Sequence, residues 1–397
     1  MYDLDELVKA SKTLVIFKEL NKDRVLRSFI DTLSYIYSEN NDAAVDSYCE
    51  FISGLYEYGD DLTKYMQSLI LESENLYIIK KAENRPTGEL LDECLANELY
   101  LLEKIASVPC ERILSKLDNK NFMPRYRTSD CDFSKLYADR IHGLDKFGYG
   151  IFAQYHMFLS KDGEIVPVKY PDEISLSDFS GYEMERKQVI DNTLALLAGK
   201  PANNVLLYGD CGTGKSSTVK AIANDYAKNG LRLIELKKKQ LHELPDIVKQ
   251  ISRNPLKFII FIDDLSFTED DDDFAALKAI LEGSVSSSAN NICIYATSNR
   301  RHLIRETFSA RKGDEIHFKD TMQELISLSD RFGLTITFTK PDKIHYLSVV
   351  EELAKKYEIK MPLEELKTQA EAFALTRAGR SPRVAKQFIE YIKGSEE

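Results

Sequence analysis

Residues 209–216 of this sequence read Gly-Asp-Cys-Gly-Thr-Gly-Lys-Ser and so match the pattern GxxxxGK[ST] in full. They follow a β-prone run, 204–208, and precede a stretch of helical character, which predicts a strand, a tight turn and a helix. Glycines let the backbone of such a turn curve closely, with its N–H groups pointing inward. Because the positive end of the following helix dipole lies at the same place, the turn favours an anion. The pattern therefore predicts a phosphate-binding loop.

Four side chains in two segments supply the expected chemistry of this loop. Lys215 places a positive charge near the β- and γ-phosphates of a nucleotide, and the Ser216 hydroxyl is suited to ligate Mg²⁺. One strand–helix unit later, the apolar run 258–262 ends in Asp263 and Asp264, at the strand end where ligands bind in open α/β sheets. Asp263 is the expected second Mg²⁺ ligand, and Asp264 either polarises the attacking water or holds Asp263 in place. The predicted cofactors are ATP and Mg²⁺, and the predicted nucleotide-binding residues are Gly209, Asp210, Cys211, Gly212, Thr213, Gly214, Lys215, Ser216 and Ser217.

Strand and helix signals alternate from about residue 171 onward. This alternation predicts a parallel sheet covered by helices on both faces. After Pro341 the strand signals stop and three helical stretches follow, which predicts a helical module over residues 341–397. The β-prone runs are 204–208, 231–236, 258–262, 292–296 and 334–338.

The first part of the chain has a different pattern. Residues 1–120 carry apolar side chains at three- and four-residue spacing with few prolines or glycines, which predicts an all-α domain. Residues 121–170 are expected to be a connector. Within it, an Asp-Gly pair at 162–163 separates the β-prone runs 151–159 and 164–170 and predicts a hairpin. The predicted domains are therefore 1–120, 121–170, 171–340 and 341–397.

Charge and cysteine content narrow the class of protein. The formal net charge is -11, so the overall field does not attract nucleic acid. The six cysteines form no CxxC pair, which favours reduced thiols. We find no secretory signal and no apolar run of about 18 residues, the length that spans a bilayer. The prediction is a cytoplasmic protein that does not enter a membrane.

The strand order, the motif spacing and the C-terminal helical module resemble AAA-type ATPases (ATPases associated with diverse cellular activities) over about residues 171–394. The closest resemblance is to a bacterial family of predicted AAA-type ATPases labelled as a domain of unknown function, in segments 201–210 and 261–267. The resemblance implies an α/β P-loop core with a five-stranded parallel sheet and a C-terminal helical lid. In this chain an all-α N-terminal domain would precede them.

The resemblance also implies roles for residues outside the two motifs. Asn299, after the strand Tyr-Ala-Thr-Ser, is similar to the residue that reads the γ-phosphate. Arg331 lies in a segment similar to the one that supplies an arginine finger to a neighbouring subunit, and Arg383 resembles the lid arginine that reaches back over the phosphates. Gly181 and Tyr182 occupy the place where family members hold adenine. A homo-oligomer with ATP sites between subunits is therefore expected.

One departure from the family pattern leaves the activity open. Most AAA-type ATPases carry Asp-Glu after the apolar strand, whereas this chain has Asp264 in the second place. The predicted function is an ATPase that remodels or assembles an unknown protein partner bound through residues 1–120. One alternative is a switch that hydrolyses ATP slowly or not at all.

A second alternative is a DNA-associated loader or motor. It would use a basic cluster that consists of Arg300, Arg301, Arg305, Arg311 and Lys312. The other interpretation of this cluster is an ordinary solvated or intersubunit surface.

The acidic run 269–273 is expected to be the solvated start of a helix, not a metal site.

Overall fold

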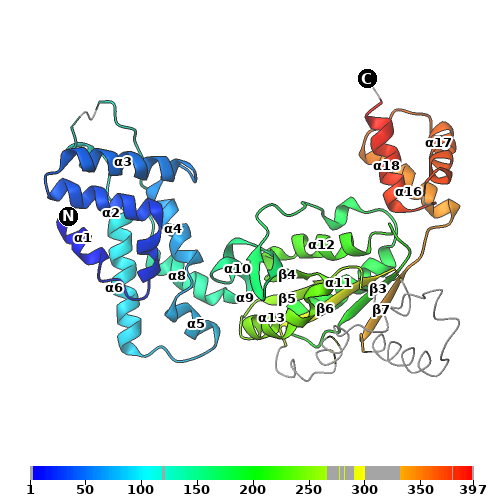
Figure 1. The fold of residues 1–397 in the computed structure, drawn as a ribbon, viewed down its shortest axis with the longest axis horizontal. Coiled ribbons are helices and arrows are strands. Elements are labelled where there is room, and N and C mark those ends of the chain that lie inside the picture. The colour runs from blue at the N-terminus through cyan, green and yellow to red at the C-terminus, as the bar shows by residue number, and fades with distance from the viewer. Residues whose placement is uncertain are drawn as a thin grey trace. The chain divides into compact units, whose positions relative to one another are not determined.

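The computed structural model describes residues 3–118, 121–265, 277, 281, 290–299, 331–377 and 379–395. The chain divides into two compact units, Met1–Gln154 and Tyr155–Glu397 (Figure 1). This division falls inside the segment expected as a connector. No helix in the described part of the chain is long and apolar enough to cross a membrane.

Helices make up the regular structure described in the first unit, apart from one bridge between Asp61 and Arg127. They enclose an apolar core in which Phe29, Leu33 and Phe51 are fully buried. Several helices begin at an Asp or Asn whose side chain accepts a backbone N–H of the first turn, as Asp23 does from Leu26. The helices are α1 (Leu4–Ser11), η1 (Lys18–Lys22), α2 (Arg24–Tyr37), α3 (Asn41–Tyr56), α4 (Leu62–Glu72), α5 (Leu76–Ala82), α6 (Glu89–Ala106), α7 (Cys110–Leu114), α8 (Phe133–His142), α9 (Leu144–Phe147) and α10 (Ile151–Gln154).

A buried carboxylate holds the connection between α1 and η1. Glu98 in α6 is only 6% exposed. It accepts the backbone N–H groups of Val15 at 2.7 Å, Ile16 at 3.0 Å and Phe17 at 2.9 Å. Hydrogen bonds to a charged acceptor are stronger than neutral ones. Glu98 therefore stabilises residues 15–17, whose backbone N–H groups bond to its carboxylate.

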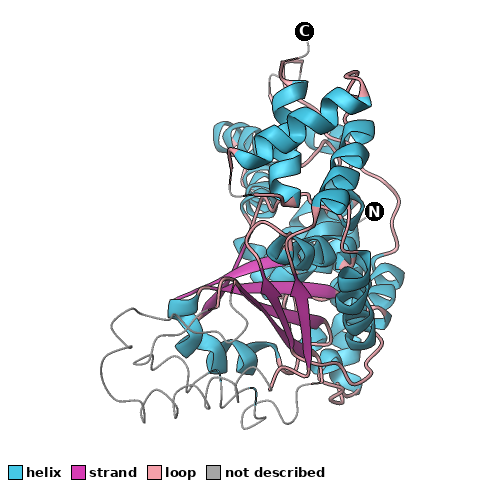
Figure 2. Ribbon diagram, turned by 90° about the vertical axis from the view of Figure 1, so that its right-hand side faces the viewer, coloured by secondary structure: helices cyan, strands magenta, loops and turns pink. Residues whose placement is uncertain are grey.

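The second unit is built on one sheet, drawn in magenta in Figure 2. Its strand order is β2-β1-β4-β5-β6-β3-β7. The five predicted strands are present and mutually parallel where they pair. All five residues from Phe258 to Ile262 are fully buried, as expected of a strand covered on both faces. These strands are β3 (Val205–Gly209), β4 (Leu231–Leu236), β5 (Lys257–Ile262), β6 (Ile292–Ser298) and β7 (Leu334–Phe338).

The prediction of a five-stranded, all-parallel sheet is wrong, because the hairpin of the expected connector joins the sheet. β1 (Met157–Lys161) pairs parallel with β4, and β2 (Glu164–Pro167) pairs antiparallel with β1. The turn has the predicted chemistry: Asp162 and Gly163 both have positive φ, 54° and 79°, as a tight hairpin turn requires. Residues 151–154, expected within the first strand, form α10 instead.

Helices cover the sheet of the second unit. Side chains of α11 and α12, including Val189 and Ile222, pack into the core formed by the strands. The elements are η2 (Leu176–Asp178), α11 (Glu183–Leu197), α12 (Lys215–Asp225), η3 (Ala227–Asn229), η4 (Lys238–Glu243) and α13 (Leu244–Ile251).

The C-terminal helices form the predicted helical module with a core of their own. They are α16 (Lys343–Lys356), α17 (Leu363–Leu375) and α18 (Pro382–Lys393). Tyr346 and Ile389 are fully buried between them. Arg380 closes the module by donating two hydrogen bonds, both 2.8 Å, to the Glu371 carboxylate. We call this module the lid.

Candidate nucleotide-binding site

The glycine-rich loop connects the end of β3 to the start of α12, as predicted. Gly209, Gly212 and Gly214 have φ angles of 133°, 80° and 93°, which side chains rarely adopt. At Gly209 space is also limiting, because a Cβ there would lie 2.1 Å from the carbonyl oxygen of Phe338. The neighbouring strand β7 therefore excludes a side chain where the loop begins.

Lys215 is the buried cation of this loop, with 6% of its surface exposed. Its Nζ donates to the carbonyl oxygens of Gly209 at 2.8 Å and Asp210 at 2.7 Å, and to Asn299 Oδ1 at 3.1 Å. Burial lowers the pKa of the ammonium, while Cys211 and the nearby carboxylates, among them Asp210, act in the opposite direction. The lysine is thus held beside the loop by oxygens of fixed position.

Asp263 receives several hydrogen bonds on a single oxygen. Its Oδ1 accepts from Ser216 Oγ at 2.6 Å, from Thr297 Oγ1 at 2.5 Å and from the backbone N–H of Asp264 at 3.1 Å. The structure therefore brings together the two residues predicted to hold Mg²⁺. The contact with Thr297 was not predicted, because the sequence does not show that β6 lies beside β5 in the sheet.

The donor set suits magnesium shared with a nucleotide. Among the residues that the structure describes, no group of three or more His, Cys, Asp and Glu side chains could hold a metal ion. Mg²⁺ is usually held by one or two carboxylates together with substrate phosphates and water. The hydroxyl of Ser216 and the carboxylate of Asp263 are oxygen donors of this kind, so they fit the predicted ion.

Asp264 and Asn299 form a second pair at the same edge of the sheet. Asn299 Nδ2 donates to Asp264 Oδ1 at 2.9 Å, while the Oδ1 of the same amide accepts from Lys215. Asp264 has a φ of 51°, an uncommon value for a residue with a side chain. Its backbone N–H donates to Thr297 Oγ1 at 3.0 Å, which helps to hold this conformation. The three predicted residues thus form one hydrogen-bonded chain.

The lid touches the loop where α18 begins. The backbone N–H of Arg383 donates to the carbonyl oxygen of Gly212 at 3.2 Å, and the hydroxyl of Ser381 would lie 3.1 Å from a Cβ at Gly212. The Arg383 side chain is exposed. The backbone of Arg383, the residue predicted to reach the phosphates, therefore contacts the loop directly.

Arg331 lies away from this group. It precedes β7, whose Leu334 pairs with Val205 at the start of β3, whereas Phe338 pairs with Gly209 at the loop. Four strand residues at about 3.3 Å each separate the two ends by roughly 13 Å. Arg331 is half-buried. It lies near the amino ends of the parallel strands, whereas the loop of its own chain lies at their carboxyl ends.

Gly181 and Tyr182 line a pocket of about 630 Å³ between the core and the lid. The Tyr182 ring stacks on Phe338, with centroids 5.3 Å apart, and its hydroxyl donates to the carbonyl oxygen of Thr339 at 2.5 Å. A Cβ at Gly181 would lie 3.3 Å from a methyl group of Val349 in α16. The predicted adenine-holding residues therefore sit where the core meets the lid.

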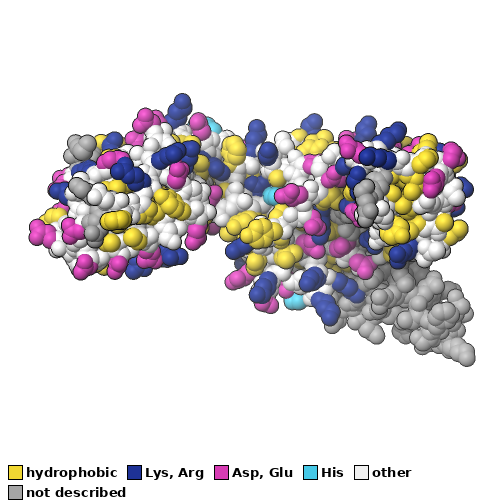
Figure 3. All heavy atoms as spheres, turned by 90° about the horizontal axis from the view of Figure 1, so that it is seen from above, with side chains coloured by type: hydrophobic (Ala, Val, Ile, Leu, Met, Phe, Trp, Pro, Cys, Tyr) yellow, Lys and Arg dark blue, Asp and Glu magenta, His cyan; other side chains and the backbone are white. Residues whose placement is uncertain are grey.

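Two further expectations concern residues outside those that the structure describes, namely the acidic run 269–273 and the basic cluster from Arg300 to Lys312. Of the remaining loop residues, Thr213 is buried and donates to the carbonyl oxygen of Asp210 at 2.9 Å. Cys211 is exposed and Ser217 is half-buried. On the face seen in Figure 3, Lys and Arg side chains are interspersed with Asp and Glu.

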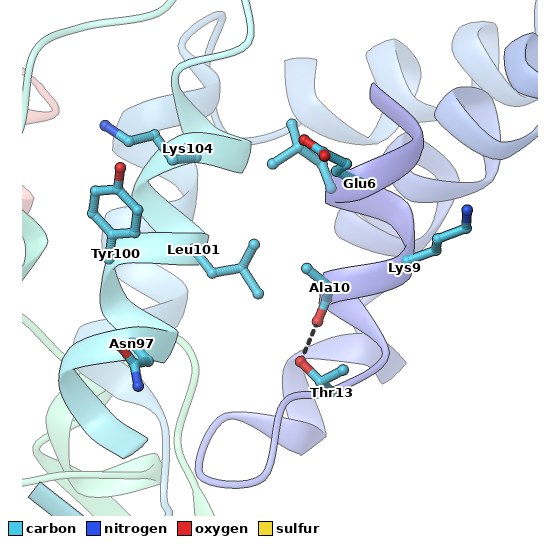
Figure 4. Close-up of a pocket in the computed structure, with 9 residues that line it drawn as sticks. Glu6, Lys9, Ala10, Thr13, Asn97, Tyr100, Leu101 and Lys104 are labelled. Atoms are coloured by element: carbon cyan, nitrogen blue, oxygen red, sulfur yellow. Dashed lines mark hydrogen bonds between the residues drawn. The ribbon is translucent and has the colours of Figure 1, made fainter. Parts of the chain in front are cut away.

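The first unit has a pocket of its own, of about 580 Å³, between α1 and α6. Figure 4 shows Leu101 and Ala10 pointing into it from the two helices, with Tyr100 and Lys104 along one side. Nothing in the sequence pattern of residues 1–120 marked this site, because the residues that line it from α1 and from α6 lie more than 80 positions apart in the chain.

Comparison with known proteins gives a family and several distant relatives. A protein-family model described as "Protein of unknown function (DUF815)" matches residues 152–396. The chain is similar to the 26S proteasome regulatory subunit 6B homolog of Schizosaccharomyces pombe, with 35% identity over 113 residues, 25% of this chain and 29% of that protein. It is also similar to the chaperone protein ClpB of Enterococcus faecalis, with 20% identity over 250 residues, 56% of this chain and 25% of ClpB.

The chain spans less than a third of the length of these two relatives. Among solved structures, it is similar to the RuvB Holliday junction branch migration motor of Thermotoga maritima, with a TM-score of 0.37 and 16% identity over 55% of this chain and 63% of that one. The family match and the curated relatives confirm the predicted resemblance to AAA-type P-loop ATPases.

Proposed function

The chain belongs to the family described as "Protein of unknown function (DUF815)", and because that description names no activity, we propose from the site itself that the protein binds Mg-ATP and hydrolyses it. The observation that carries the proposal is the hydrogen-bonded chain from Lys215 through Asn299 to Asp264, beside the contact between Ser216 and Asp263. These groups have the charges and hydroxyls that a nucleoside triphosphate and its metal need.

Each part of the site has a separate task in this proposal. The loop N–H groups and Lys215 bind phosphate oxygens, and Ser216 with Asp263 would hold Mg²⁺, which neutralises charge on those oxygens when bound. Asp264, oriented by Asn299, would accept a hydrogen bond from the attacking water. Positioning and charge neutralisation supply most of the catalysis in phosphoryl transfer.

A switch with slow turnover is the second candidate, and one observation favours it. Asp264 carries a shorter side chain than the glutamate usual in AAA-type ATPases, and its carboxylate is already bonded to Asn299. Fewer acceptor positions of the Asp264 carboxylate are then available to orient water. Steady-state phosphate release separates the candidates, because a switch would bind Mg-ATP and release phosphate at no more than a background rate.

The first experiment tests nucleotide binding. Lys215→Ala should weaken ATP binding at least 100-fold, an estimate of about 3 kcal/mol from the loss of one charge-assisted contact. Lys220→Ala is the matched control, since Lys220 lies on the same helix but pairs with Glu235 at 2.9 Å. Calorimetric titration of both variants, with their melting curves, is the measurement. Near-parent affinity in a folded Lys215→Ala variant would refute the proposal.

The second experiment separates metal binding from hydrolysis. Asp263→Ala should bind ATP without the tightening that Mg²⁺ gives the parent, because a metal ligand is removed. Asp264→Asn should bind Mg-ATP and lose turnover. If Asp264→Asn releases phosphate at the parent rate, Asp264 does not orient the water, and the role assigned to it here is wrong.

Two parts of the proposal concern other molecules. The placement of Arg331 at the far edge of the sheet supports an assembly in which it serves the ATP site of a neighbouring copy, which would be a head-to-tail contact. The first unit, with its separate core, would select a protein partner to be remodelled or assembled. A purified protein retained by Asp264→Asn with ATP, but not by Lys215→Ala, should accelerate phosphate release by the parent. A partner that leaves the rate unchanged would contradict this role.

A further inference from the structure

The chain leaves the sheet through residues 338–340 before it enters the lid at α16. Each of these three residues is bonded through its backbone to a group on another element. The backbone N–H of Asp210 donates to the Phe338 carbonyl oxygen at 3.0 Å, and the Tyr182 hydroxyl donates to that of Thr339. The backbone N–H of Lys340 donates to Asp210 Oδ2 at 2.8 Å. We call residues 338–340 the lid hinge.

Asp210 is also part of the phosphate-binding loop. Its carbonyl oxygen accepts from the Lys215 ammonium at 2.7 Å and from the Thr213 hydroxyl at 2.9 Å. One residue is therefore bonded both to the cation expected to meet the phosphates and, through its carboxylate and its N–H, to both ends of the lid hinge. The motif GxxxxGK[ST] accepts any residue at the position of Asp210, so the motif itself does not explain why an aspartate is there.

The lid contacts the same loop at a second point, where the backbone N–H of Arg383 donates to Gly212. The loop is thus bonded to the polypeptide that enters the lid and to the last helix of the lid. A change in loop geometry would act on the lid at two separate places. Two contacts restrict the orientation of the lid relative to the loop, whereas one contact would restrict only their distance.

We propose that Asp210 is a positioning residue that couples the phosphate-binding loop to the lid through the backbone N–H of Lys340. This inference rests on the proposed function, because it assumes that phosphates order the loop. In this role the Asp210 side chain acts on the hinge and not on the phosphates. It transmits the order of the loop to the hinge and so sets the orientation in which Arg383 faces the site.

Two variants separate the hydrogen bond from the charge. Asp210→Ala removes both, whereas Asp210→Asn keeps an acceptor oxygen of the same reach and removes the charge. If the bond is what matters, Asp210→Asn should lie much closer to the parent than Asp210→Ala does, because a neutral acceptor keeps a weaker form of the bond. If Asp210 acts through its charge on Lys215, the two variants should behave alike.

Hydrogen exchange of residues 338–345 in the full chain, without nucleotide, is the direct measurement. A hydrogen bond to a charged group is worth about 1.5–3 kcal/mol, so Asp210→Ala should speed exchange of the Lys340 amide about 10- to 100-fold. Asp225→Ala is the matched control, because Asp225 also binds a backbone N–H, that of Leu176 at 3.0 Å. It should leave residues 338–345 unchanged. Parent-like exchange in Asp210→Ala would overturn the proposal, as would equal acceleration in both Asp210 variants.

The same measurement with a slowly hydrolysed ATP analogue tests the coupling. The parent and Asp210→Asn should gain protection over residues 338–345 when the analogue saturates them, and Asp210→Ala should gain little at its own saturating concentration. Equal gains in Asp210→Ala and the parent would refute coupling through Asp210. A parent that does not bind the analogue would instead refute the proposed function, and the nucleotide-free comparison would still decide whether Asp210 holds the hinge.

Discussion

Thr297 joins the two aspartates of the site, and replacing it with valine should weaken both the second unit and the proposed metal site. The residue is 2% exposed. Its hydroxyl donates to Asp263 Oδ1 at 2.5 Å and accepts the backbone N–H of Asp264 at 3.0 Å. Valine has nearly the same shape, so Thr297→Val removes these two bonds while it keeps the packing.

The expected loss follows from the two bonds. A hydrogen bond to a charged group contributes about 1.5–3 kcal/mol, and a buried N–H that loses its acceptor costs about 1–3 kcal/mol. The second value is reduced here because Asp264 is an exposed residue and its N–H retains Asp263 Oδ1 at 3.1 Å. We therefore expect Thr297→Val to lower the free energy of unfolding of the second unit by about 2–3 kcal/mol. Asp264, in its left-handed conformation, should also lose its alignment with Asn299.

The assay is urea unfolding of the full chain, followed by hydrogen exchange of β5 and β6, which reports the second unit by itself. Thr297→Ser is the control, since it keeps the hydroxyl and loses one buried methyl group worth about 0.8 kcal/mol. Mg²⁺-dependent ATP binding should persist in Thr297→Ser and weaken in Thr297→Val. The reasoning fails if Thr297→Val unfolds within about 0.5 kcal/mol of the parent, or if the serine variant is destabilised as much as the valine variant.

Three further perturbations test other parts of the molecule. Arg331→Ala should bind the ATP analogue nearly normally and lose about 10³-fold or more in hydrolysis, and mixing it with Asp264→Asn should recover part of the activity; a fully active monomer by mass measurement would contradict the shared site. The guanidinium partner of Glu371 in the lid lowers the pKa of that carboxyl group below its ordinary value of 4.5. Ionised Glu371 therefore stabilises the lid above that pH, and the contribution is lost as the pH falls through the lowered pKa. The melting temperature of the parent should exceed that of Glu371→Gln at pH 7, and the difference should shrink as the pH falls below about 4.5; a constant difference would refute the assignment. Glu98→Gln should destabilise the first unit by about 2–4 kcal/mol in urea, because backbone N–H groups lose a charged acceptor, whereas Glu93→Gln, on the exposed side of the same helix, should have little effect.

Much of the second unit could be predicted from the sequence because its signals are local. The loop at 209–216 needs glycine for its φ angles and a helix immediately after it, and both requirements act within eight residues. The buried strands are nearly continuous apolar runs, since a parallel sheet is covered on both faces. The Asp-Gly turn at 162–163 likewise depends only on backbone angles of adjacent residues.

Other features depended on which distant segments became neighbours. The hairpin was predicted, but its pairing with β4 was not, because its edge groups can pair with any strand that tertiary packing brings near. The role of Thr297 follows from the alignment of β5 with β6, and the contact between Asp210 and Lys340 joins residues 130 positions apart. A threonine or an aspartate carries no mark of such a partner in its local sequence. Register and packing decide which polar groups meet. The sequence therefore determined the loop and its strands, and only the tertiary structure decided which groups join the loop to the proposed metal site and to the lid.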